Sequence, residues 1–246
     1  MRIALVSDIH GNLPALQAVA ADIERRGVDR VVCLGDNLSG PLLPRETAHW
    51  LMASDWLVLA GNHERQILDY PRKGGGPSDG YALSQLGEPE LAWLRGLRSE
   101  VWMDEEVLLC HGTPRSDCEH FLESLRAGRL EAATSDEIGE RLGPVAARLV
   151  ACGHSHVPRI VRRPDGALLV NPGSVGLQAY EDDHPQPYVM EQGTPDAVYA
   201  IVERGADGLW SGSHRTVPYD TSAMAALAAR HGRAAWEAAL LRGRVH

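Results

Sequence analysis

The sequence of 246 residues has no apolar run near the roughly 20 residues that a membrane-spanning helix needs, so we expect no membrane segment. Basic residues are also few: 24 Lys and Arg stand against 33 Asp and Glu, for a net charge of -9. A protein that binds long nucleic acid needs a positive face for the phosphates, so this balance argues against such a partner. Charged residues are only 23% of the chain and hydrophobic residues are 44%, which excludes a mostly disordered chain.

Cysteine is scarce as well, and the four cysteines form no CxxC pair. Cys33, Cys110 and Cys152 each lie in an apolar run, where cysteine behaves as a small buried hydrophobic residue. Free structural thiols are typical of a reducing compartment. The segment Met1–Asp8 is too short and too soon acidic for a signal peptide. We therefore expect a cytoplasmic protein.

Short apolar, β-branched runs alternate with longer helical patterns at the start of the chain. A strand pattern at Arg2–Ser7 precedes Leu13–Arg26, where apolar residues have the spacing of one helix face. A strand, a helix and a strand are then expected at Arg30–Leu34, Pro44–Ala53 and Trp56–Ala60. This order predicts parallel strands joined by right-handed crossovers.

The rest of the chain predicts further helices and then hairpins. Helices are expected at His63–Tyr70, Gly80–Leu86, Pro89–Leu97, Cys118–Leu125 and Ser135–Leu142, with a terminal helix at about 221–241. Strands are expected at Glu100–Met103, Val107–Cys110 and Leu149–Cys152, and hairpins within 159–170 and 196–217. With no linker or repeat, we predict one α/β domain over residues 1–246, built as two facing mixed β-sheets flanked by helices. This is a four-layer α-β-β-α sandwich.

The 11 histidines are the unusual feature, because several stand at the ends of expected strands. Five strands are followed at once by residues able to bind a metal or transfer a proton: Asp8 and His10, Asp36, Asn62 and His63, His111, and His154 and His156. Ligands of open α/β sheets bind at the carboxyl ends of strands, so we expect these eight side chains along one edge. Each of these residues alone could simply cap a helix or form part of a turn. A purely structural explanation would, however, have to apply at all five strand ends at once, so we favour a shared functional site.

Apart from His63, the set offers two carboxylates, one amide and four imidazoles, and no thiolate. That mixture suits Mn, Fe, Co, Ni or Zn rather than a structural zinc site or an all-oxygen calcium or magnesium site. Seven ligands are too many for one catalytic ion and suit two. A bridging Asp would hold two ions about 3.5–4 Å apart with a hydroxide between them. We expect two divalent transition-metal ions per chain, with manganese as the first candidate.

Five sequence blocks occur in the order and spacing of the calcineurin-like metallophosphoesterase superfamily. They are Asp8-Ile9-His10-Gly11-Asn12, Gly35-Asp36, Gly61-Asn62-His63-Glu64, His111-Gly112 and Gly153-His154-Ser155-His156. The blocks His111-Gly112-Thr113-Pro114 and Asn171-Pro172-Gly173-Ser174-Val175-Gly176 further resemble its small bacterial and archaeal phosphodiesterase branch. The resemblance covers about residues 1–217 and implies the same sandwich fold and the hydrolysis of phosphate esters.

The resemblance also implies a role for each residue. Asp8, His10 and His156 would hold one ion, Asn62, His111 and His154 would hold the other, and Asp36 would bridge them. His63 would be the acid or electrostatic residue near the leaving oxygen.

Two further residues are candidates for substrate binding. The resemblance implies that Asn12 touches the substrate phosphate, although capping the helix that begins at Leu13 explains it equally well. Arg115, just past His111, could neutralise a phosphate oxygen, although a plain surface arginine is an alternative.

The substrate class is predicted from a missing arginine. Protein-phosphatase relatives carry an Asp-Arg-Gly after the bridging Asp, whereas Asn37-Leu38-Ser39-Gly40 follows Asp36 here, with no arginine. A phosphomonoester is a dianion and needs cationic groups beyond the metals. We therefore expect hydrolysis of small-molecule phosphodiesters or phosphoanhydrides, of the cyclic-nucleotide or dinucleoside-polyphosphate type.

The alternatives are phosphomonoesterase or protein phosphatase activity at the same site, or a non-catalytic metal-site scaffold that binds partners. The segments Lys73–Pro77 and Glu181–Pro187 are expected to be loops that could close over a ligand. The sequence leaves the formation of a homo-oligomer open.

Overall fold

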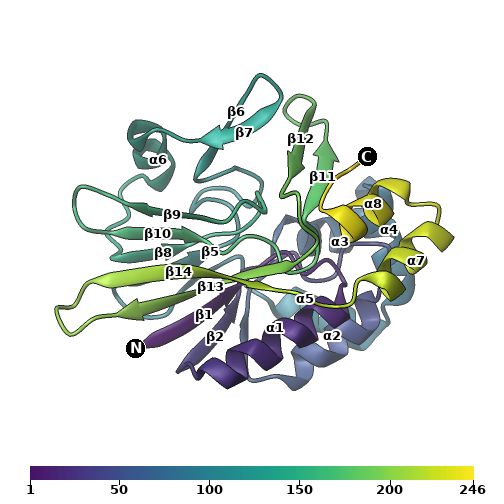
Figure 1. The fold of residues 1–246 in the computed structure, drawn as a ribbon, viewed down its shortest axis with the longest axis horizontal. Coiled ribbons are helices and arrows are strands. Elements are labelled where there is room, and N and C mark those ends of the chain that lie inside the picture. Colours follow the sequence, from purple (N-terminus) through teal and green to yellow (C-terminus); the bar gives the residue numbers. More distant parts are fainter.

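Two five-stranded mixed sheets lie face to face in the computed structural model, which describes residues 1–246 (Figure 1). The first sheet has the order β14-β13-β1-β2-β3, and the second has the order β4-β5-β8-β10-β9. The first consists of β1 (Arg2–Val6), β2 (Arg30–Cys33), β3 (Leu57–Val58), β13 (Ala197–Arg204) and β14 (Trp210–Val217). The second consists of β4 (Glu100–Trp102), β5 (Val107–Cys110), β8 (Leu149–Ala151), β9 (Arg159–Arg162) and β10 (Leu168–Asn171).

Each sheet is parallel at its centre. Strands β1, β2 and β3 pair in parallel, as do β5, β8 and β10, whereas β13, β14, β4 and β9 are antiparallel to their neighbours. The carboxyl ends of parallel strands lie at the same edge of a sheet. The parallel pairing of these strands therefore brings the expected metal-binding residues at their carboxyl ends close together.

The alternation of side chains along β1 separates the layers. Ile3 and Leu5 pack against Leu109 and other residues of the second sheet, so they form the core between the sheets. Ala4 and Val6 point the other way, into a cluster with residues of helix α1 (Leu13–Arg26) and helix α2 (Pro44–Ala53).

Helix α6 (Ser135–Leu142) covers the outer face of the second sheet, where its Ile138 packs with Leu108 and Val150. Figure 1 shows α1 and α2 beyond one sheet and α6 beyond the other. The order helix, sheet, sheet, helix confirms the predicted sandwich.

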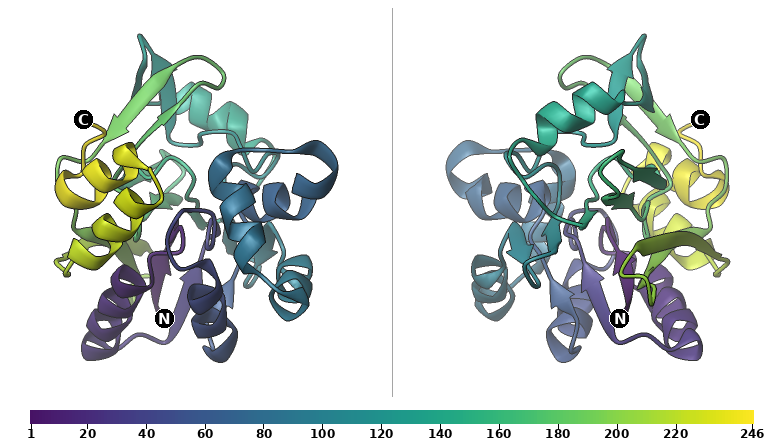
Figure 2. Two further views of the ribbon diagram at one scale, coloured as in Figure 1. Left: turned by 90° about the vertical axis from the view of Figure 1, so that its right-hand side faces the viewer. Right: turned by 90° about the vertical axis from the view of Figure 1, so that its left-hand side faces the viewer.

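Two groups of helices flank the edge where the strands end. Helices α3 (Asn62–Lys73), α4 (Pro77–Gln85) and α5 (Glu88–Gly96) follow β3, and α7 (Ser222–Arg230) and α8 (Ala234–Arg242) close the chain. Figure 2 shows α3 and α4, in blue, on the opposite side of the molecule from α7 and α8, in yellow. None of the helices combines the length and the apolar composition needed to cross a membrane.

The helix expected at Cys118–Leu125 is wrong. The chain there leads into a hairpin of β6 (Glu123–Arg126) and β7 (Arg129–Ala132), joined by Ala127 and Gly128 at φ of 49° and 75°. Two residues at positive φ are the requirement of a tight hairpin turn. The guanidinium of Arg141 also donates to the carbonyls of Phe121 and Glu123, which a helix would have used internally.

Two other expectations need correction. The terminal helix is two helices, because the chain turns at Gly232, which has a φ of 69°. The segment Glu181–Pro187 is not wholly loop, because strands β11 (Ala179–Asp182) and β12 (Tyr188–Glu191) pair across it. The expected hairpins within 159–170 and 196–217 are confirmed as β9–β10 and β13–β14.

Candidate metal centre

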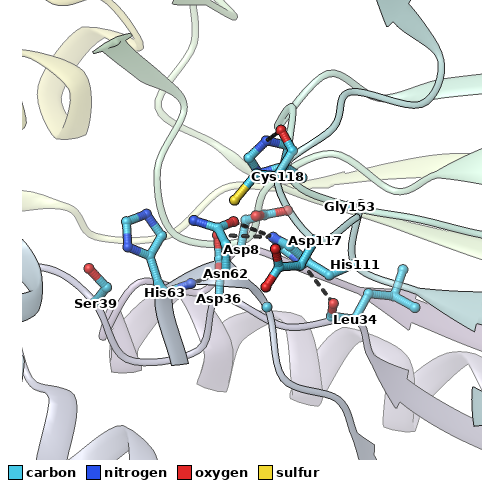
Figure 3. Close-up of polar contacts among 12 residues, drawn as sticks. Asp8, Leu34, Asp36, Ser39, Asn62, His63, His111, Asp117, Cys118 and Gly153 are labelled. Atoms are coloured by element: carbon cyan, nitrogen blue, oxygen red, sulfur yellow. Dashed lines mark hydrogen bonds and ion pairs between the residues drawn. The ribbon is translucent and has the colours of Figure 1, made fainter. Parts of the chain in front are cut away.

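The loops that follow β1, β2, β3, β5 and β8 converge, and the metal-binding side chains expected from the sequence lie together there. Figure 3 shows Asp8, Asp36, Asn62 and His111 among them. Two groups of three have their ligand atoms within 4.8 Å of one another: Asp8, His10 and His156, and Asp36, His111 and His154. Asn62, the first residue of α3, joins the second group, since its Oδ1 lies 3.2 Å from Nε2 of His111. All seven residues expected as ligands are thus brought to one place.

Each histidine is fixed by a backbone carbonyl through one ring nitrogen. Nδ1 of His10, His111 and His156 donates to the carbonyls of Ser39, Leu34 and Leu177 at 2.7, 2.9 and 2.7 Å. Nε2 of His154 donates to the carbonyl of Cys118 at 3.0 Å. Because a carbonyl only accepts, the other nitrogen of each neutral ring carries a lone pair. This is the usual arrangement behind metal-binding histidines.

The first group holds polar atoms that lack partners. Neither carboxylate oxygen of Asp8 accepts a hydrogen bond, although the residue is fully buried. Nε2 of His10 and Nε2 of His156 lie 3.1 Å apart, and Nε2 of His156 lies 3.3 Å from Oδ1 of Asp8. Two lone pairs and a bare carboxylate repel one another, and a shared cation would reverse that repulsion. The residues present therefore fit a divalent metal ion.

The protonation states suit ligation as well. Burial lowers the pKa of His10 to about 4 and that of His154 to about 3, which leaves both rings neutral near pH 7. Burial works against ionisation of Asp36, but the charges of His111 and His63 outweigh it and hold the pKa of this carboxyl well below its usual range. His111 is the exception: burial would lower its pKa, but the carboxylates of Asp36 and Asp8 raise it to about 10, so an ion would have to displace the proton of this ring. Neutral imidazoles and an ionised carboxylate are the forms that bind metals.

The backbone is strained at the same residues. Asp8, His10, Asp36, His154 and His156 have φ of 56°, 53°, 54°, 69° and 58°. This left-handed region is unfavourable for residues other than glycine, and such strain gathers at functional sites. Five of the six positive-φ residues that are not glycine belong to the expected ligand set, the sixth being Ala127.

Two glycines let the loops after β2 and β3 touch. Gly35 has a φ of 110°, and a Cβ added to it would lie 2.5 Å from the backbone nitrogen of Gly61. A Cβ on Gly61 would lie 2.2 Å from Oδ1 of Asp36. Asp36 and Asn62 can therefore be neighbours only because both positions are glycine.

Glu64 has a structural role here that the sequence reading did not assign. Its fully buried carboxylate accepts from the backbone nitrogens of Asp36, Asn37 and Gly61 at 2.9, 2.8 and 2.8 Å. It therefore caps α3 and holds the Asp36 loop against the start of that helix. The spacing Gly61-x-x-Glu64 is a capping-box pattern and was the available signal.

His63 lies beside this centre and is paired with a second residue that the sequence did not indicate. Its backbone nitrogen donates to Oδ1 of Asp36 at 3.0 Å, and its Nδ1 donates to Oδ1 of the buried Asp79 at 2.7 Å. Burial alone would lower the pKa of His63, but the carboxylates of Asp36 and Asp79 raise it to about 9. Asp79 lies on α4, past the glycine-rich loop, where no local pattern points to it.

Both residues expected to bind the substrate form hydrogen bonds with other residues of the protein. The buried Asn12 accepts from the nitrogen of Ala15 as the cap of α1, and its amide donates to the carbonyl of Gly176 and the hydroxyl of Tyr219, both at 2.9 Å. The exposed guanidinium of Arg115 donates to both carboxylate oxygens of Glu119 at 2.7 and 2.6 Å. Arg115 nevertheless lines a cavity together with Asn62 and His154, whereas Asn12 is enclosed by its partners.

The family model described as the calcineurin-like phosphoesterase superfamily domain matches residues 1–192, which include every residue of both ligand groups. The chain belongs to this superfamily. Members of this superfamily typically bind a dinuclear metal centre, and the two His/Asp groups are candidate metal sites of this chain.

Individual relatives agree with the assignment to the superfamily. An uncharacterized protein of Methanocaldococcus jannaschii is 28% identical over 207 residues, which cover 78% of this chain and 75% of that protein. The structure of a metallophosphoesterase from Sphaerobacter thermophilus superposes with a TM-score of 0.70 at 25% identity, over 94% of this chain and 95% of that one. A putative diadenosine tetraphosphatase shares the fold, with a TM-score of 0.54 at 16% identity over 87% and 93% of the chains.

Proposed function

We propose that this superfamily member is a phosphodiesterase-type phosphohydrolase that uses two divalent transition-metal ions, manganese first among them, in the cytoplasm. The observation that carries the proposal is the meeting of two His/Asp groups, oriented by backbone carbonyls, at one cleft. Asp8, His10 and His156 would hold one ion, Asn62, His111 and His154 the other, and Asp36 would serve both. Two such ions would balance charge on a phosphate and activate a water molecule at neutral pH.

His63 is proposed to assist the leaving group. Asp79 fixes the hydrogen on Nδ1 and favours the imidazolium form, so Nε2 can present a proton to the cleft. The bond from the backbone of His63 to Asp36 ties the ring to the metal-binding loop. His63 would therefore donate a proton to the departing oxygen or stabilise charge on it.

The charges around the cleft favour a diester over a monoester. The cavity that contains His63 and Asp36 has a volume of about 820 Å³ and is lined by no Lys or Arg. The basic residues Arg115 and Arg141 line a second cavity of about 790 Å³, which also reaches Asn62 and His154. Asn37, which follows Asp36 directly, is buried and donates to the carbonyl of Leu59 at 3.0 Å. A dianionic monoester bound on the His63 side would lack the extra cation that it needs there, whereas two ions suffice for the single charge of a diester. The proposed substrates are small phosphodiesters or phosphoanhydrides.

The test compares bis-p-nitrophenyl phosphate with p-nitrophenyl phosphate on manganese-loaded protein, with Asp36→Ala as the inactive variant. We expect kcat/KM to be higher for the diester and Asp36→Ala to abolish turnover. A preference for the monoester would contradict the substrate class, and full activity of Asp36→Ala would contradict the metal mechanism.

A further inference from the structure

The C-terminal helix α8 contributes to the lining of the cavity at the metal ligands. Trp236, on α8, lines it together with His63, Tyr180 and Leu177. The residues that the family model matches end at 192, so α8 lies outside the matched part of the chain, which carries the ligands. Figure 1 shows α8 beside β11. Strand β11 belongs to the β11–β12 hairpin, which borders the same cavity.

Trp236 and His63 flank the same metal-binding histidine. The ring of His10 lies 6.0 Å from the ring of Trp236 and 5.4 Å from the ring of His63, measured between centroids. Both contacts are edge to face, at 77° and 76°. A group that departs beside His63 therefore enters the space next to the indole.

Packing holds the indole in place. One edge of its six-membered ring lies against Gly40, where an added Cβ would come within 2.8 Å of it. Leu42 and Leu177 belong to the two apolar clusters between which Trp236 packs. The indole is only half-buried, and it is among the residues that line the cavity. A fixed, partly open aromatic ring is a platform on which a flat ring can stack.

The same wall is anionic. Besides Asp36, the carboxylates of Asp79, Glu181, Asp182 and Asp183 line the cavity, and no Lys or Arg faces them there. A second phosphate in this space would meet carboxylates without a basic partner. An uncharged ring would meet no such repulsion.

We infer that Trp236 determines specificity for the leaving group, and that this group is an uncharged alcohol carrying an aromatic ring, such as a nucleoside. The inference rests on the proposed function and narrows it: diesters that release a neutral nucleoside are substrates, and anhydrides that release a nucleotide are poor ones.

The first experiment compares two matched variants of Trp236. Trp236→Phe keeps an aromatic face, whereas Trp236→Leu keeps apolar bulk for the contacts with Leu42 and Leu177 but removes that face. With adenylyl-adenosine as substrate, we expect Trp236→Leu to lower kcat/KM by about 5- to 150-fold, the range measured for loss of base stacking, and Trp236→Phe to lower it much less. Trp102→Leu, at an exposed tryptophan on β4, is the control. Equal values for the Phe and Leu variants would overturn the role of Trp236.

The second experiment tests the charge of the leaving group. The wild-type protein should hydrolyse adenylyl-adenosine, which releases neutral adenosine, with at least about a tenfold higher kcat/KM than diadenosine tetraphosphate, which releases a nucleotide from either end. Equal values, or a preference for the tetraphosphate, would overturn the uncharged leaving group.

A binding measurement separates this inference from the proposed function. Adenosine titrated into metal-free protein by calorimetry should bind the wild type and Trp236→Phe, and bind Trp236→Leu about 5- to 150-fold more weakly. Unchanged affinity in Trp236→Leu would overturn the contact whatever the activity. If the wild type hydrolysed no diester while adenosine binding still depended on Trp236, the proposed reaction would fail and the aromatic contact would stand.

Discussion

Replacement of His63 tests catalysis separately from metal binding, because His63 is expected to act in the reaction without binding a metal ion. It is not in either ligand group, yet it is tied to Asp36 by its backbone and to Asp79 by its ring. We expect His63→Ala to keep two ions per chain and to lose about 100-fold or more in kcat on bis-p-nitrophenyl phosphate, the usual loss when a general acid is removed. Metal analysis and steady-state kinetics on the same sample measure both. The control is His49→Ala, an exposed histidine on α2. An unchanged kcat would refute the role given to His63.

Asp79 acts on the reaction only through His63, so it is a positioning residue. Removing its charge should leave the ring less well oriented and less readily protonated. We expect Asp79→Asn to lower kcat about tenfold with little change in KM, since no substrate contact is lost. Asp183→Asn removes a carboxylate from the same cavity without touching His63 and should keep the wild-type kcat. If both variants had the same kcat, the His63–Asp79 hydrogen bond would have no role in turnover.

Gly61 tests how closely the two ligand loops must approach. Its replacement by alanine places a methyl group 2.2 Å from Oδ1 of Asp36, so the loops must separate. We expect Gly61→Ala to weaken metal binding about 10- to 100-fold, comparable to the loss of a residue that orients a ligand. Gly96→Ala is the control, because no atom lies within 4 Å of its added Cβ and its φ is not positive. Isothermal titration calorimetry with the metal ion measures the affinities of the Gly61→Ala and Gly96→Ala variants. Equal affinities would show that the loops have room to move.

Among the elements, α1 is held to the first sheet by a charged contact as well as by its apolar face. Oδ2 of Asp22 accepts from the hydroxyl of Tyr199 on β13 at 2.7 Å and from Nε of Arg26 at 2.6 Å. Burial would raise the pKa of Asp22, but the bonds from Arg26, Tyr199 and Arg25 outweigh it and lower the pKa below its ordinary value. The contact therefore stabilises the fold only while Asp22 is ionised.

This depressed pKa predicts an acid-dependent stability. Its contribution is fully present above the pKa of the unfolded chain, about 3.9, and is lost as the pH falls through the lower pKa of the folded state. We expect Asp22→Asn to lower the free energy of unfolding by about 1–3 kcal/mol at pH 7, and the difference from wild type to shrink below about pH 4. Urea unfolding at pH 7 and at acid pH measures it. A difference that grew toward acid pH would have the wrong sign.

The elements that the sequence predicted best are those with a local signal. The strands β1, β2 and β5 have apolar runs that end in polar residues, and α1 has a clear apolar face. The segment that leads into β6 was predicted as a helix because the contacts that favour another conformation come from Arg141, which donates to the carbonyls of Phe121 and Glu123 from further along the chain. The strands β11 and β12 were missed because each has only four residues and β11 ends in Glu181 and Asp182, so the segment shows no sustained apolar alternation.

For the whole molecule, the topology explains why the ligands were predictable. Parallel strands bring their carboxyl ends to one edge, so residues directly after strands meet whatever their separation in sequence. Asp79 and Trp236 lie on helices that no strand end precedes, and only the packing of α4 and α8 carries them to the cleft. The grouping of the candidate ligands could thus be predicted from the sequence, whereas the positions of Asp79 beside His63 and of Trp236 at the cavity could not.

The central claim is that one chain holds two metal ions between Asp8, Asp36 and their histidine and asparagine neighbours. Metal analysis by mass spectrometry of the manganese-reconstituted protein, after removal of unbound ions, tests it most directly. We predict two ions per chain for the wild type and fewer than two for His156→Ala, which loses a ligand of the first group. A wild-type protein with one ion or none per chain would contradict the account.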